Sequence, residues 1–152
     1  MHSGDLVFNS ILLASIVVLL VLISVSDIRK RTIPNSYIAM LAVLSLSLGF
    51  QYYSPEYLFN YFLLITILLT TFYFGWMGGG DVKLIAILAL ALPSVITVVA
   101  LWLTMIFGGV LAVVRLSQYR FSLISAKKDQ RGLPYGVAIS MGFCLPLIYI
   151  YI

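Results

Sequence analysis

Long apolar runs with almost no charge inside them constrain the fold of this chain more than any other feature. A membrane-spanning helix needs about 20 predominantly apolar residues. Such runs fall at 6–26, 36–53, 57–76, 94–114 and 133–151, with a shorter one at 82–92. With 62% hydrophobic and only 9% charged residues, the chain cannot cover itself in polar surface. The sequence predicts an all-α integral membrane protein with six transmembrane helices in a single domain, residues 1–152.

The basic residues predict the orientation of these helices. All nine fall in the first, third and fifth connections, which six helices place on one side of the membrane: Arg29, Lys30, Arg31, Lys83, Arg115, Arg120, Lys127, Lys128 and Arg131. The positive-inside rule makes that side cytoplasmic and puts both termini on the other side. This placement fits a membrane better than nucleic acid, so we expect lipid, and not nucleic acid, as a partner of the basic groups.

Several kinds of site are excluded because few residues can build them. The chain has one cysteine, Cys144, and one histidine, His2, so an intrachain disulfide, a zinc cluster and a Ser–His dyad near the membrane cannot form. A Ser–Lys pair using Lys83 stays open. We expect no metal and no cofactor. The acid–base chemistry rests mainly on five carboxylates: Asp5, Asp27, Glu56, Asp81 and Asp129.

Two of these acids lie at the cytoplasmic ends of predicted helices. Asp27 ends the first helix, and Asp81 follows three glycines, Gly78, Gly79 and Gly80. Ionisable groups at membrane depth are costly and indicate function by default. The glycines favour an extended strip, free of side chains, against which a substrate backbone can lie.

Each aspartate also has a purely structural interpretation. Asp27 would pair with Arg29 or Lys30 at the end of its helix, and Asp81 would cap a helix that starts at Val82. The chain has only five acids, and two of them lie at the same predicted depth. This coincidence favours a functional role over the two structural interpretations.

A pair of carboxylates that share one proton is the machinery of an aspartic protease. The ionised member takes a proton from the attacking water, and the protonated member donates to the scissile carbonyl oxygen. The sequence does not assign these roles to Asp27 or Asp81 individually. Lys83 either tunes the pair or anchors its helix at the interface.

Three segments resemble the type IV prepilin peptidase family of GxGD membrane aspartic proteases. The segment Asp27–Asn35 is similar to its D-x-R-x-x-x-I-P-N motif, and Gly78–Leu84 is similar to G-x-G-D-x-K-L. Leu133–Ala138 resembles a P-Y-G-x-A stretch that opens the last helix. The resemblance implies that Asp27 and Asp81 are catalytic. It assigns supporting roles to Arg29, Pro34, Asn35, Gly78, Gly79, Gly80 and Lys83.

The resemblance also implies a reaction and a place for it. The substrate would be a prepilin or pseudopilin precursor, cut between its basic leader and its hydrophobic segment at the cytoplasmic face of a prokaryotic inner membrane. The long members carry a cysteine-rich insert linked to N-methylation, which this chain lacks, so we expect cleavage without methylation. The short form is similar to peptidases of Tad/Flp pili. Presenilin-like proteases fit less well, because Ser26 precedes Asp27 where they have Tyr, and no Pro-Ala-Leu motif is present.

The Ile33–Asn35 segment also has a structural interpretation, as the start of the second predicted helix. Asn35 suits the N-cap of the second helix, after an extended Ile33-Pro34 step. The connection 115–132 mixes basic and apolar residues, which favours a short amphipathic helix on anionic lipid over the alternative, a role in gripping substrate.

Two other functions stay open, and the oligomeric state is not predicted. A small transporter or channel also uses broken helices and paired acids, although no acid falls in the outer half of a predicted helix to complete a relay. A non-catalytic membrane assembly subunit would use the aspartates only for capping and pairing.

Overall fold

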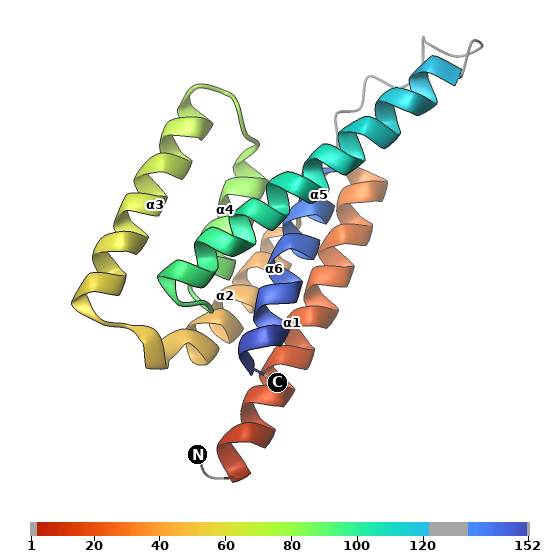
Figure 1. Cartoon of the computed structure of the whole chain (residues 1–152). Coiled ribbons are helices and arrows are strands. Elements are labelled where there is room, and N and C mark those ends of the chain that lie inside the picture. The colour runs from red at the N-terminus through yellow and green to blue at the C-terminus, as the bar shows by residue number, and fades with distance from the viewer. Residues whose placement is uncertain (1–2, 122–133, 152) are drawn as a thin grey trace.

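The computed structural model describes residues 3–121 and 134–151, and within these ranges all regular secondary structure is helical (Figure 1). The elements are α1 (Ser3–Lys30), α2 (Asn35–Gly49), a 3₁₀ helix η1 (Phe50–Tyr52), α3 (Pro55–Tyr73), α4 (Gly79–Ala89), α5 (Ser94–Phe121) and α6 (Tyr135–Tyr151). The predicted all-α class and the six α-helices are confirmed within the described ranges.

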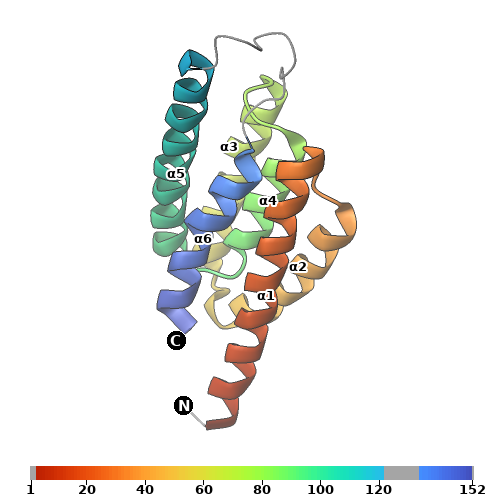
Figure 2. The same ribbon diagram turned by 90° about the vertical axis from the view of Figure 1, so that its right-hand side faces the viewer.

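Successive helices run in opposite directions, so the chain forms an up-and-down bundle (Figures 1 and 2). The end of α1 and the starts of α2, α4 and α6 lie at one end, and the first residues of α1 and the last of α6 lie at the other. Among the described residues, three helices are long and apolar enough to cross a membrane: Val7–Lys30, Pro55–Tyr73 and Ser94–Ser117. The six-span topology and the sides of the termini therefore stay predictions.

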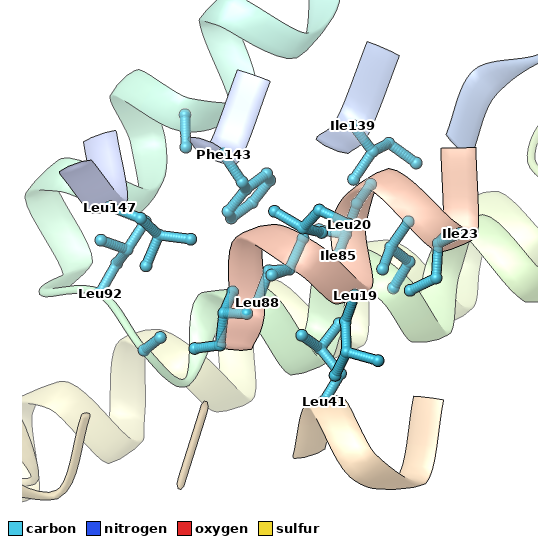
Figure 3. Close-up of a cluster of buried hydrophobic side chains, with 14 of the residues drawn as sticks. Leu19, Leu20, Ile23, Leu41, Ile85, Leu88, Leu92, Ile139, Phe143 and Leu147 are labelled. Carbon is cyan, nitrogen blue, oxygen red and sulfur yellow. The ribbon is translucent and has the colours of Figure 1, made fainter. Parts of the chain in front are cut away.

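One face of α1 carries the centre of the core. Leu20 and Ile23 are buried there, and they pack against Ile85 of α4 and Ile139 of α6 (Figure 3). Helix α6 lies between α1 and α5 and also contacts α4, whereas α3 packs mainly on α4 and only slightly on α5. The core thus joins the helices that carry the two predicted aspartates.

Helix α4 has only 11 residues. At about 1.5 Å per residue it is roughly half as long as the hydrocarbon core is thick, so its last carbonyl groups need partners inside the bundle. Tyrosine hydroxyls supply them. Tyr57 donates to the Ala89 carbonyl at 2.8 Å, Tyr61 donates to Ala86 at 3.1 Å, and the Tyr151 hydroxyl lies 2.7 Å from the Ala91 oxygen.

Most helix boundaries differ from the sequence prediction by a few residues; α1, for example, covers Ser3–Lys30 and not 6–26, and α2 ends at Gly49 and not at 53. Three further differences concern α3, α4 and α5. Helix α3 ends at Tyr73 because Gly75 adopts a φ of 71°, which turns the chain. Helix α4 begins at Gly79 and not at 82, since an extended Gly78 precedes it. Helix α5 continues to Phe121, so the first part of the predicted 115–132 amphipathic helix is continuous with α5. The rest of that segment, 122–132, lies outside the described residues.

Candidate active site

Asp27 faces the core because of its register on α1. It follows Ile16, Leu20 and Ile23 at spacings of four, three and four residues, which places all four on one helical face. Its side chain is 7% exposed. A buried carboxylate needs a donor, and the backbone N–H of Gly136, in the first turn of α6, donates to Asp27 Oδ2 at 2.8 Å.

Gly136 leaves the space that this carboxylate occupies. A Cβ atom at that position would lie 2.8 Å from Asp27 Oδ2 and 3.1 Å from its Cγ, which is closer than side chains tolerate. Only glycine, therefore, lets the start of α6 approach Asp27 closely enough for this hydrogen bond.

Asp81 lies in the first turn of α4, and Gly78 precedes that helix as its N-cap in an extended conformation, with φ −69° and ψ 144°. The alternative in which Asp81 caps a helix starting at Val82 is therefore wrong. The expected extended glycine strip is also corrected, because Gly79 and Gly80 belong to α4 and only Gly78 is extended. First-turn residues need no intrahelical partner for their N–H groups, so glycines are tolerated there.

Both aspartates line one pocket of about 450 Å³ at the end of the bundle where α1 ends and α4 begins. Its walls are formed by Asp27, Arg31, Thr32, Ile33, Asn35, Ile38, Gly78, Gly79, Gly80, Asp81, Lys83 and Tyr135. The two carboxylates are close enough for the charge of Asp27 to act on Asp81. At about 30 Å³ per water molecule, the pocket has room for water and part of a peptide.

The α1–α2 connection packs on the glycine turn. The Ile33 side chain would lie 3.5 Å from a Cβ at Gly80, so Ile33 covers that glycine. Lys83 Nζ donates to Asn35 Oδ1 at 3.5 Å, a long and exposed contact. Pro34, and not Asn35, is the N-cap of α2, and it has an extended backbone. Asn35 is the first helical residue, so the expected N-cap is shifted by one position.

The predicted supporting residues do not all reach the pocket. Asn35, the three glycines and Lys83 line it, whereas Pro34 acts at the helix start and Arg29 is exposed on the last turn of α1. Sequence analysis did not select Arg31 or Gly136 as site residues. Gly136 had a signal, the P-Y-G-x-A stretch, but Arg31 had none beyond its position between Asp27 and Pro34. In the described part of the chain, no three His, Cys, Asp or Glu residues cluster as metal ligands.

Comparison with known proteins agrees with this arrangement. The model of the type IV leader peptidase family matches residues 14–113, a range that contains both aspartates and most of the pocket wall. The chain belongs to the type IV leader peptidase family. The resemblance to prepilin peptidases is thereby confirmed, while the similarity to the Tad/Flp members stays a prediction.

A curated relative of this leader peptidase family member is prepilin peptidase EppA of Methanocaldococcus jannaschii. The two are 35% identical over 72 residues, which is 47% of this chain and 21% of EppA. The alignment thus spans about a fifth of the relative. No solved structure gives a significant match.

Proposed function

We propose that this chain is a membrane aspartic endopeptidase that removes basic leaders from prepilin-like precursors. The observation that carries the proposal is the shared pocket, in which Asp27 and Asp81 face one space beside a glycine turn. Membership of the leader peptidase family and the relation to a prepilin peptidase support this class of substrate.

The surroundings of the two acids differ, and this difference supports a separate role for each. Asp27 accepts the Gly136 N–H, lies at the positive end of the α6 dipole, and is acted on by the charge of Arg31. These contacts favour its ionised form. Asp81 accepts no such hydrogen bond in the described part of the chain; its burial and the charge of Asp27 both disfavour its ionised form, so we assign the shared proton to Asp81. Asp27 is therefore the general base and Asp81 the general acid.

The reaction then balances over two steps. In the first, water adds to the scissile carbonyl carbon, one of its protons passes to Asp27, and the Asp81 proton passes to the carbonyl oxygen. In the second, the C–N bond breaks, the nitrogen takes the proton from Asp27, and one hydroxyl of the diol returns a proton to Asp81. Both acids end in their starting states, and neither metal nor cofactor enters the scheme.

The proposal places the pocket at the cytoplasmic face. Arg29, Lys30, Arg31 and Lys83 all belong to the end of the bundle that carries the pocket, as the positive-inside rule requires of a cytoplasmic end. Cleavage proceeds without N-methylation in this scheme, and a labelled S-adenosylmethionine assay on the cleaved product tests that point.

Co-expression with a candidate prepilin tests the central proposal. Asp27→Asn and Asp81→Asn each remove a proton-transfer group at almost constant volume, so each should stop conversion of precursor to mature product on a gel. Glu56→Gln is the matched control, because Glu56 is an exposed acid at the opposite end of the bundle. Full processing by either aspartate variant would contradict the dyad.

The transporter alternative makes a different prediction in liposomes. Purified chain would conduct ions or protons across the bilayer and cleave nothing. Of the acids whose side chains are described, Asp27 and Asp81 share one pocket and Glu56 lies near the far end, so no chain of acids crosses the bundle among them.

A further inference from the structure

The proposed function uses the guanidinium of Arg31 only through the action of its charge on Asp27. Its Nε and Nη1 atoms are buried and have no hydrogen-bond partner. Arg31 lines the same pocket as Asp27 and Asp81. Burying a charged donor without a partner is unfavourable, so an arginine held in this way needs a reason beyond the stability of the resting protein.

The backbone of Arg31 is held in an unusual conformation as well. Its φ is 54°, in the left-handed region, and its N–H donates to the Asp27 carbonyl at 3.0 Å. This is the cap that ends a helix with one left-handed residue, a position where glycine is strongly favoured. Helix termination alone would select glycine, and arginine is present instead.

In the described part of the chain, Arg31 makes no direct ion pair with an acid of the pocket. Its charge acts on Asp27, but within the described ranges no ion pair or hydrogen bond links the guanidinium to either carboxylate. Lys83, the other cation of the pocket, is exposed and contacts Asn35.

The charge balance of the pocket indicates what the guanidinium binds. The walls carry two cations, Arg31 and Lys83, and two acids, Asp27 and Asp81. When the acids share one proton they carry one negative charge, so the pocket keeps an excess of positive charge. The oxygen of a peptide carbonyl, which becomes negative as water adds to its carbon, fits this excess.

We propose that Arg31 is a further catalytic residue, which binds the scissile carbonyl oxygen and stabilises the negative charge that develops there. This rests on the proposed function. As the C–O bond to water forms, the carbonyl electron pair moves onto the oxygen, which the guanidinium holds until the Asp81 proton arrives. The Nε and Nη1 donors of Arg31 are already desolvated, so less solvent has to be displaced when they bind the developing oxyanion, which makes such donors effective.

Arg31→Gly is the decisive variant, because glycine suits the left-handed backbone and removes only the side chain. The substrate is a precursor that the unaltered chain cleaves, and the measurement compares rates at saturating and limiting precursor concentration in detergent. We expect an unchanged or higher melting temperature and a kcat lower by about 100- to 1,000-fold. Arg31→Lys should recover part of that loss, since it restores a charged donor. Lys30→Gln, which removes an exposed neighbouring charge, should leave kcat unchanged.

Three outcomes would overturn the inference. They are an unchanged kcat in Arg31→Gly, a change in KM alone, and equal rates for Arg31→Gly and Arg31→Lys. The Asp27→Asn and Asp81→Asn variants run in parallel keep this inference separate from the proposed function. If they are inactive while Arg31→Gly is fully active, only the role of Arg31 is wrong, whereas if they are active the dyad itself fails.

Discussion

The N–H of Gly136 donates to Asp27 Oδ2 at 2.8 Å and so fixes the start of the last helix to the end of the first. The hydrogen bond satisfies a buried carboxylate and an N–H group that the first turn of a helix leaves free. The family match ends at residue 113, before α6. The structure therefore adds α6 to the candidate active site as the element that orients Asp27.

Replacement of Gly136 by alanine should strongly slow the proposed cleavage without unfolding the protein. The new Cβ would lie 2.8 Å from Asp27 Oδ2, so either the carboxylate or the helix must shift. A misplacement of about 1 Å in a catalytic group costs roughly 100-fold in rate. We expect a loss of that size in precursor cleavage, measured as an initial rate with purified protein.

Gly109→Ala is the matched control for this experiment. Gly109 lies within α5, and a Cβ there would meet no atom within 4 Å. Alanine stabilises an exposed helix interior by about 0.5–1 kcal/mol over glycine, so this variant should cleave normally and melt slightly higher. Normal cleavage by Gly136→Ala would mean that the contact with Asp27 does not matter for the reaction.

Gly78→Ala should have a milder effect on the second acid. Its backbone conformation suits alanine, but the added Cβ would lie 3.1 Å from Asp81 Oδ2. The Asp81 carboxylate can move away by a few tenths of an ångström. We therefore expect kcat to fall about tenfold, with little change in stability. A loss as large as that of Asp81→Asn would show instead that the glycine turn itself must move or admit substrate.

Much of this arrangement was predictable from short-range patterns. The spacing of Ile16, Leu20, Ile23 and Asp27 places the acid on the core face of a helix. The alternation of helix direction then brings Asp27 and Asp81 to one end of the bundle. Both follow from the period of the helix and from the number of helices.

The contacts that finish the site were not predictable in the same way. The Gly136–Asp27 hydrogen bond joins residues 109 positions apart, and it depends on how closely α6 packs against α1. The start of α4 at Gly79 was missed because the low helix propensity of glycine costs little in a first turn. The left-handed backbone of Arg31 was missed because this conformation is rare for any residue other than glycine.

The orientation of the bundle can be tested with single cysteines in a Cys144→Ala background. Lys30→Cys places a thiol at the end of α1, just before α2, and Glu56→Cys places one in the first turn of α3, after α2; both positions are exposed. If α2 crosses the membrane with its start inside, an impermeant maleimide should label Glu56→Cys in intact cells. The same reagent should label Lys30→Cys only after permeabilisation.

Helix α2 has 15 residues, which is short for a membrane span, so the labelling pattern decides whether it crosses. Labelling of both cysteines from the same side would mean that α2 does not cross the membrane, and the predicted topology would be wrong. Labelling of Lys30→Cys alone in intact cells would place the pocket outside and would contradict cleavage at the cytoplasmic face.

Tyr151→Phe should destabilise the bundle, because the Tyr151 hydroxyl donates a hydrogen bond to a carbonyl group just after the end of the short helix α4. That hydroxyl is buried and lies 3.0 Å from the Leu48 oxygen and 2.7 Å from the Ala91 oxygen, so its hydrogen is shared between two carbonyl groups. Without it, both carbonyls lose a buried donor, which costs about 1–3 kcal/mol.

Tyr149→Phe is the control, since Tyr149 is 82% exposed two residues away on the same helix. Thermal unfolding in detergent should show a lower melting temperature for Tyr151→Phe alone. Equal melting temperatures for the two variants would contradict a structural role for tyrosine hydroxyls at the end of α4.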